Sequence, residues 1–310
     1  MQTYYSNGKL LLTGEYVVLN GALALAIPTR FGQSLNVVSI PEKKIIWKSV
    51  DDQDKIWFEY ELKLDRGILQ SDQHGNDILK RLCQIINVAN QLNPNFLKGN
   101  SGYSIESKLT FPREWGLGSS STLINNIAQW ANADAFKLLK LTFGGSGYDI
   151  ASAQHDFPIT YQLKEPFDCS QNDKRFVNGV TFNPEFKECL YFVYLNKKQD
   201  TRDGIIHYRK NASDHSNEIS EISKLTLKFI DCKQLDEFNT LVNQHESIIS
   251  NLIKQEPIKS TLFEDFNGSI KSLGAWGGDF ILATSKEDPT PYFKARGFNT
   301  VIPFNKMILN

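Results

Sequence analysis

The first part of the chain carries two short apolar runs, at residues 10–12 and 17–26, among polar residues. The second run is interrupted by Asn20-Gly21, the preferred pair for a tight type I′ turn between two strands. A stretch rich in Val, Ile, Trp and Phe follows, and then residues 75–92 place their apolar side chains at helical spacing. We therefore expect strands first, with a hairpin turned at Asn20-Gly21, and a helix after them.

A short strand-like segment at 102–109 leads to a loop rich in glycine and serine at residues 116–121. The apolar residues Leu123, Ile127 and Ala131 come next and share one face of a helix. The pattern predicts a glycine loop that runs directly into a helix N-terminus.

The second half mixes strand-like and helical spacing without strict alternation, which favours an α+β fold. Helical spacing marks 219–230, 235–253 and a segment leading to Leu273, whereas strand spacing marks 159–163, 190–195, 276–284 and 300–304. We place a domain boundary near Pro184, which predicts domains at 1–184 and 185–310.

Composition narrows the kinds of partner. The chain has 310 residues, of which 41% are hydrophobic and 22% charged, and its formal net charge is -1. Since the basic residues are scattered, the sequence lacks the basic patch of a nucleic-acid-binding protein, and a small molecule is the expected partner. We leave open whether the protein is a monomer or a homodimer.

The cysteines and the apolar runs bear on the cellular compartment. The four cysteines are Cys83, Cys169, Cys189 and Cys232. They lie far apart without a CxxC pair, so buried thiols are expected rather than a zinc site or a disulfide framework. Because no leader-like start and no stretch of about 18 apolar residues is present, we expect a cytoplasmic protein without a membrane span.

The glycine loop is the strongest chemical signal. Unpaired amides at a helix N-terminus, together with the helix dipole, attract phosphate oxygens, and glycines allow close approach. The residues expected to hold nucleotide phosphates are Gly116, Leu117, Gly118, Ser119, Ser120 and Ser121. The loop is neither a Walker A loop, nor a GxGxxG fingerprint, nor a GxSxG elbow, and taken alone it is more typical of a plain helix cap.

Three segments in order resemble the motifs of GHMP kinases, the superfamily of galactokinase, homoserine kinase, mevalonate kinase and phosphomevalonate kinase. Residues 112–122 resemble the second motif, Pro followed by Gly-Leu-Gly-Ser-Ser at a helix start. Residues 7–16 resemble the first motif, and residues 274–279 resemble the glycine-rich third motif. The resemblance implies an N-terminal domain like ribosomal protein S5 domain 2, a ferredoxin-like C-terminal domain, and ATP with Mg²⁺ as cofactors.

A fourth segment, residues 145–151, resembles the part of mevalonate and phosphomevalonate kinases that supplies the acidic active-site residue. The resemblance makes Asp149 the catalytic candidate and Lys9 its cationic partner. A serine hydroxyl of the glycine loop is the candidate ligand of Mg²⁺; Ser120 is the first choice, and Ser119 is the alternative. The Gly-Tyr-Asp-Ile-Ala string at 147–151 is similar to a GHMP subgroup. Without these motifs, Asp149 would read as a turn residue and Lys9 as a surface residue.

The same resemblance implies a set of substrate contacts, which includes a loop at 197–202 after a buried strand. These residues are Glu15, Tyr16, Ser146, Gly147, Thr201, Arg202, Gly274, Gly277, Gly278 and Asp279. The glycines of the third motif are also typical of a tight bend without a ligand. The charged residues at 197–202 are likewise typical of a solvated loop.

We therefore expect an ATP-dependent kinase of a small metabolite, with mevalonate or phosphomevalonate as the leading acceptor. Two features depart from mevalonate kinase: residues 131–144 offer Asp134 but no Glu for Mg²⁺, and Trp276 puts a bulky ring in the third motif. The alternatives are a family relative that binds a nucleotide or ligand without turnover, and an enzyme like mevalonate diphosphate decarboxylase.

Overall fold

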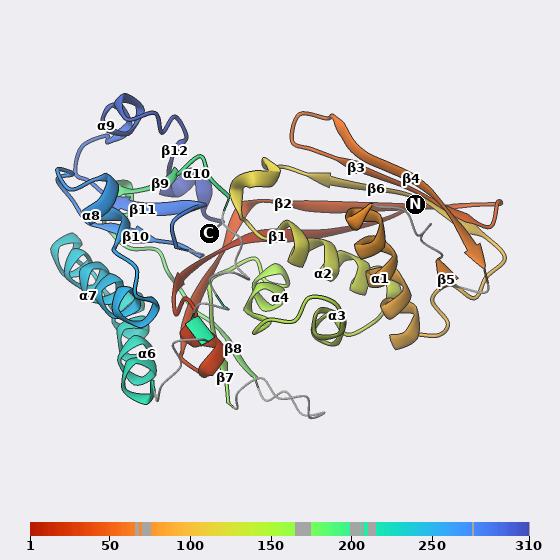
Figure 1. Cartoon of the computed structure of the whole chain (residues 1–310), viewed down its shortest axis with the longest axis horizontal. Helices are drawn as coiled ribbons and strands as arrows, with labels where there is room; N and C mark the ends of the chain where they lie inside the picture. Colours follow the sequence, from red (N-terminus) through yellow and green to blue (C-terminus); the bar gives the residue numbers. More distant parts are fainter. Residues whose placement is uncertain are drawn as a thin grey trace. The chain divides into compact units, whose positions relative to one another are not determined.

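A computed structural model describes residues 1–65, 68–69, 76–164, 175–198, 205, 208–209, 215–274 and 276–309 (Figure 1). They form two compact units, each built from separate stretches of the chain. The first comprises Met1–Gly8, Phe31–Arg113 and Leu117–Gln154, and the second comprises Lys9–Arg30, Glu114–Gly116 and His155–Asn310. The expected domain ranges, 1–184 and 185–310, do not coincide with these units and stay a prediction.

The first unit is a sheet with helices packed on it. Its strands follow the order β5-β4-β3-β6-β2, and β1 also pairs with β2. Their bounds are β1 Gln2–Thr13, β2 Ala24–Ile40, β3 Lys44–Val50, β4 Ile56–Asp65, β5 Ile68–Leu69 and β6 Gly102–Leu109. The strands β1 and β2 each continue from one unit into the other, because the unit boundaries fall at Gly8 and Arg30.

Helices α1 to α4 lie together on one side of these strands (Figure 1). They are α1 Asp77–Leu92, α2 Ser119–Ala131, α3 Ala135–Thr142 and α4 Tyr148–Ala153. The core joins alternate strand residues such as Ile45 and Trp47 to one face of each helix, for example Ile86 of α1 and Ile124 of α2. The helix expected at 75–92 is therefore confirmed, and its start is capped by the side chain of Asn76.

The second unit contains a four-stranded antiparallel sheet in the order β10-β11-β9-β12. Its strands are β9 Leu190–Tyr194, β10 Ile270–Ser272, β11 Phe280–Thr284 and β12 Val301–Pro303. Its helices are α6 Ser216–Asp231, α7 Leu235–Ile253, α8 Ile258–Leu262, α9 Thr290–Ala295 and α10 Phe304–Met307. The strands β7 Ile159–Leu163 and β8 Arg175–Gly179 pair with each other, and β7 also pairs with the start of β2. The α+β class is confirmed.

Two local predictions are wrong. Asn20-Gly21 does not turn a hairpin: Val17–Asn20 is a 3₁₀ helix, and Gly21 ends it with a left-handed φ of 90°. The segment leading to Leu273 is not one helix either, because α8 ends at Leu262 and the edge strand β10 begins at Ile270.

Cys83 and Cys232 are buried and Cys189 is partly buried, whereas Cys169 lies outside the described residues. Among the described helices, none combines the length and the apolar character that a membrane span requires.

Candidate active site

The glycine loop turns sharply into α2 because both of its glycines adopt left-handed backbone angles. Gly116 has a φ of 67° and Gly118, the N-cap residue, a φ of 91°. No side chain caps this helix, so its first backbone amides lack the acceptor that an Asn or Ser cap would supply. Such an end is suited to an anion.

The residues of the loop differ in what they can offer to a ligand. The Leu117 side chain is fully buried and anchors the loop in the core. The Ser121 hydroxyl donates to the carbonyl oxygen of Gly118 at 2.8 Å and is also buried. Ser119 is partly buried and Ser120 is exposed, which makes these two hydroxyls the ones available to a bound group.

A buried polar network fixes α2 to the strands of the first unit. Thr122 Oγ1 donates to Gln33 Oε1 at 2.6 Å, and Asn126 Nδ2 donates to the Gln33 carbonyl at 2.8 Å. Asn125 Nδ2 donates to Ser6 Oγ, which donates in turn to Asn126 Oδ1 at 2.7 Å. Satisfied buried networks of this kind make a core rigid, so the loop is carried on a well-fixed helix. In the sequence, the signal of this network is the helical spacing of the polar residues Thr122, Asn125 and Asn126 among apolar ones.

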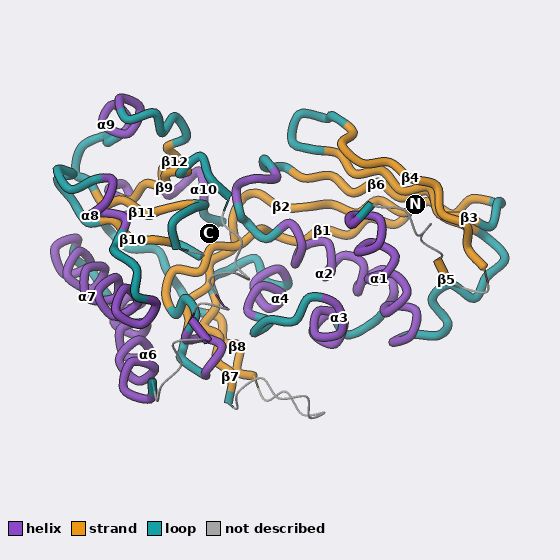
Figure 2. The backbone as a smooth tube through the Cα atoms, viewed as in Figure 1, coloured by secondary structure: helices purple, strands orange, loops and turns teal. Residues whose placement is uncertain are grey.

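Asp149 belongs to the same unit as α2. It lies in the first turn of α4, two residues after the N-cap Gly147, whose φ is 88°. Figure 2 shows α4 beside α2, and Gln154 at the end of α4 donates from Nε2 to Asn125 Oδ1 of α2 at 3.0 Å. Ser146 is buried and Asp149 is partly buried. The first unit thus carries the start of α2 and Asp149 on two helices that pack together.

The residues just before the loop belong to the second unit, where aromatic side chains hold them. The ring of Trp115 lies against Phe280 with 5.4 Å between ring centroids, and against Tyr194 with 6.5 Å. The Tyr194 hydroxyl donates to the Glu114 carbonyl at 3.1 Å. Sequence reasoning missed these anchors because Tyr194 and Phe280 read only as strand residues.

Asp279, a predicted substrate residue, lies against Gly116 in the second unit. A Cβ atom added to Gly116 would lie 2.4 Å from Asp279 Cγ. Asp279 itself has a φ of 54° and is 8% exposed. Two of the predicted site residues are therefore brought together here.

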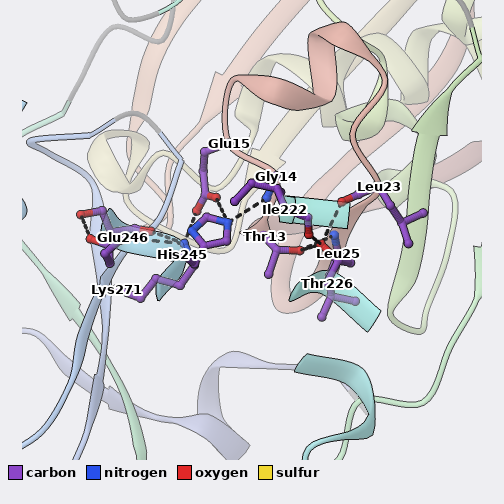
Figure 3. Close-up of polar contacts among 11 residues, drawn as sticks. Thr13, Gly14, Glu15, Leu23, Leu25, Ile222, Thr226, His245, Glu246 and Lys271 are labelled. Atoms are coloured by element: carbon purple, nitrogen blue, oxygen red, sulfur yellow. Dashed lines mark hydrogen bonds and ion pairs between the residues drawn. The ribbon is translucent and has the colours of Figure 1, made fainter. Parts of the chain in front are cut away.

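Glu15 is buried, with its carboxylate bound to a buried lysine (Figure 3). Lys271 Nζ lies 2.6 Å from Glu15 Oε1, and His245 Nε2 accepts the Gly14 amide at 3.2 Å. Burial raises the pKa of the Glu15 carboxyl, and Lys271 offsets part of that rise. Sequence reasoning missed Lys271 and His245, because each stands among other polar residues and neither belongs to a motif. The substrate role of Glu15 stays a prediction.

Tyr16 and the third glycine segment are linked by a hydrogen bond. The Tyr16 hydroxyl accepts the Trp276 amide at 3.2 Å, and burial raises the pKa of Tyr16. Gly274 and Gly277 have left-handed φ angles of 69° and 87°. The Trp276 ring is 2% exposed, so it is packed into the second unit.

The remaining predicted residues have less structural context. Lys9 lies in β1 within the second unit and is partly buried, and its pairing with Asp149 stays a prediction. Thr201 and Arg202 lie outside the described residues. Asp134 accepts the amides of Phe136 and Lys137 as the N-cap of α3, so its carboxylate is used locally.

No protein-family model and no curated protein matches the sequence, but many solved structures match the fold. Mevalonate kinase from Methanococcus jannaschii has 19% identity over 97% of this chain and 96% of its own, with a TM-score of 0.69. Phosphomevalonate kinase from Streptococcus pneumoniae, in complex with phosphomevalonate and AMPPNP, has 19% identity over 96% of each chain and a TM-score of 0.70.

The chain has the GHMP kinase fold. Galactokinase from Lactococcus lactis, complexed with galactose, extends the likeness to a sugar kinase at 13% identity, over 99% of this chain and 93% of its own, with a TM-score of 0.66. At such identities the likeness establishes the fold and leaves the reaction to be argued from the residues.

Proposed function

We propose that the chain is an ATP-dependent small-molecule kinase of the GHMP type. The observation that carries the proposal is the start of α2, where a glycine N-cap without a side-chain acceptor follows a left-handed glycine turn. The likeness to kinase structures along almost the whole chain supports the same reading. The amides of this helix start would hold phosphate oxygens of the nucleotide.

Asp149 is the proposed catalytic base. In the transfer, an acceptor oxygen forms a bond to the γ-phosphorus while the bond from phosphorus to the ADP oxygen breaks, so ADP leaves with the electron pair. A hydroxyl acceptor must also lose its proton, which would pass to the Asp149 carboxylate. Lys9 would stabilise the negative charge that develops on the transferred group.

Mg²⁺ fits the exposed Ser120 hydroxyl at the start of α2, since this ion prefers oxygen ligands and uses few from the protein. When bound, it would neutralise charge on the phosphates. Because Asp134 is engaged as a helix cap, the chain offers no carboxylate from α3, and most ligands would come from phosphate and water.

We propose mevalonate or phosphomevalonate as the leading acceptor, guided by the motif resemblance and by the phosphomevalonate bound in the similar kinase from Streptococcus pneumoniae. The two acceptors differ chemically. A phosphate acceptor is largely ionised near neutral pH, whereas a hydroxyl acceptor needs a base. Replacement of Asp149 should therefore harm transfer to a hydroxyl more than transfer to a phosphate.

A second candidate is a protein of this fold that binds a nucleotide or ligand without turning it over. The role of Asp134 as the N-cap of α3 favours it, because Asp134 is the one acidic residue in residues 131–144 and its Oδ1 is engaged by the amides of Phe136 and Lys137. A decarboxylase of the mevalonate diphosphate type is a third, and it would release carbon dioxide.

The test is ADP release from Mg-ATP with mevalonate, phosphomevalonate, homoserine and sugar acceptors, with Asp149→Asn as the matched control. The proposal predicts acceptor-dependent ADP release that Asp149→Asn abolishes for a hydroxyl acceptor and lowers less for a phosphate acceptor, while ATP affinity stays nearly unchanged. Tight ATP binding without release for any acceptor would contradict it and favour the binding protein.

A further inference from the structure

Four ionisable side chains are buried together in the second unit (Figure 3). Glu15 follows β1, His245 and Glu246 lie on α7, and Lys271 lies on β10. Lys271 and His245 are fully buried, Glu15 is 1% exposed and Glu246 is 4% exposed. Charges are costly to bury unless they are paired, so contacts within this cluster must offset the cost of desolvation.

The contacts within the cluster converge on Lys271. Its ammonium lies 2.6 Å from Glu15 Oε1 and 3.6 Å from Glu246 Oε1, and it donates to the Ser272 carbonyl at 3.1 Å. Glu246 Oε2 accepts the Ser272 hydroxyl at 2.9 Å. The cluster thus fixes the end of β10, just before the glycine segment that begins at Gly274.

The same cluster fixes the Gly14–Tyr16 turn. His245 Nε2 accepts the Gly14 amide, and Lys271 holds the next residue, Glu15. Just before this turn, Thr13 Oγ1 lies 2.7 Å from Thr226 Oγ1 of α6, which further secures the end of β1. Tyr16 has a φ of 63°, a conformation that a bulky residue keeps only when its surroundings impose it.

The segment 271–276 and the pair Glu15-Tyr16 form a closed ring of contacts. Lys271 binds Glu15, and five residues further along the chain the Trp276 amide donates to the Tyr16 hydroxyl. The segment 271–276 and the pair Glu15-Tyr16 are therefore joined at both ends. A shift at either end would be passed to the other, because both are buried and closely packed.

We propose that Lys271 and Glu15, supported by His245 and Glu246, are positioning residues that hold the Gly14–Tyr16 turn and the Gly274–Asp279 segment in register with each other. This inference rests on the proposed kinase function for its kinetic consequence, though not for its structural one. Glu15 acts through Lys271 rather than by touching the acceptor, since its carboxylate faces the buried ammonium.

Three variants test the pair. Lys271→Met leaves Glu15 without its counter-ion, whereas the double variant Glu15→Gln/Lys271→Met removes both charges of this pair. Thr284→Val is the matched control: it removes hydrogen bonds of the Thr284 hydroxyl to Asn239 of α7 at 2.6 Å and to the Ser269 amide at 2.8 Å, outside the ring. Each protein is compared by thermal unfolding, by hydrogen exchange of peptides covering 14–16 and 273–279, and by steady-state kinetics.

The proposal predicts that Lys271→Met and the double variant both exchange faster in both peptides, whereas Thr284→Val does not. The double variant should unfold at a higher temperature than Lys271→Met. It should nevertheless keep a kcat on the order of 10- to 100-fold below the wild type, as expected when reacting groups are slightly misplaced. The KM for ATP should rise less than kcat falls, because within the held segment Asp279 is the residue placed against the glycine loop, at Gly116.

Unchanged exchange at 273–279 in both Lys271 variants would overturn the proposal. So would a double variant whose kcat recovers together with its stability, because the pair would then contribute only to folding. If the wild type phosphorylates none of the acceptors, the proposed function fails, and the exchange comparison alone decides whether the pair positions the two segments.

Discussion

Replacement of Gly116 by alanine tests the contact between the glycine loop and Asp279. The new Cβ would lie 2.4 Å from Asp279 Cγ and 2.5 Å and 2.7 Å from its carboxylate oxygens, all closer than normal packing allows. Gly116 also has a φ of 67°, which alanine adopts at a cost of roughly 1–2 kcal/mol. The atomic shifts that make room for the new methyl group would cost about 1–3 kcal/mol more, the usual cost of overpacking.

Gly144→Ala supplies the control for backbone strain alone. Gly144 has a similar φ of 71°, and a Cβ placed there would meet no atom within 4 Å. Chemical denaturation should therefore show that Gly116→Ala lowers the free energy of unfolding by about 2 kcal/mol more than Gly144→Ala does. The gain in unfolded-state rigidity is common to both variants and cancels.

The double variant Gly116→Ala/Asp279→Ala removes the carboxylate that the new methyl group would strike. It should recover part of the loss, whereas Asp279→Ala alone should not stabilise the protein. Since Gly116 opens the phosphate loop, Gly116→Ala should also weaken Mg-ATP binding about tenfold, the equivalent of roughly 1.4 kcal/mol. Equal losses of stability in Gly116→Ala and Gly144→Ala would refute the reasoning.

Four further substitutions have distinct expected outcomes. Burial raises the pKa of Glu246 from 4.5 to about 7. Between these two pH values the native state holds a proton that the unfolded state has released. The free energy of unfolding should therefore fall as pH rises from about 4.5 to about 7. Glu246→Gln should remove that fall, which amounts to about 3 kcal/mol in denaturation curves; an unchanged slope would exclude the assignment. Ser121→Ala should cost about 1 kcal/mol of stability through its lost hydrogen bond. Ser120→Ala should leave the free energy of unfolding unchanged but raise the Mg²⁺ concentration needed for half-maximal turnover. If instead Ser120→Ala destabilised the protein and Ser121→Ala raised the Mg²⁺ requirement, the two serines would have exchanged roles. Tyr194→Phe should lower stability by about 1 kcal/mol, and no change would mean that its bond to Glu114 contributes nothing.

Local patterns predicted much of the fold. The helix expected at 235–253 is α7, Leu235–Ile253, and the strand expected at 102–109 is β6, Gly102–Leu109. Both have strong periodicity along their whole length, so tertiary contacts reinforce what the local pattern favours. The 3₁₀ helix Val17–Asn20 shows the opposite case. There the Asn-Gly pair fits two kinds of turn, and the local sequence does not choose between them.

The candidate site was predictable where it depends on backbone turns and unpredictable where it depends on distant partners. The glycines of the phosphate loop mark their own conformation in the sequence. Glu15 and Lys271, by contrast, are 256 residues apart, and nothing near either residue indicates the other. Trp115 likewise reads as part of the loop, whereas its ring contacts lie on β9 and β11 of the second unit.

The most direct test of the proposed function is to identify the product formed from Mg-ATP and each acceptor by mass spectrometry, with wild-type protein and Asp149→Asn side by side. With the wild type, one acceptor should gain a single phosphoryl group in step with ADP formation. Asp149→Asn should form none of this product from a hydroxyl acceptor and less of it from a phosphate acceptor. Unmodified acceptors with the wild type, despite bound ATP, would contradict the kinase assignment.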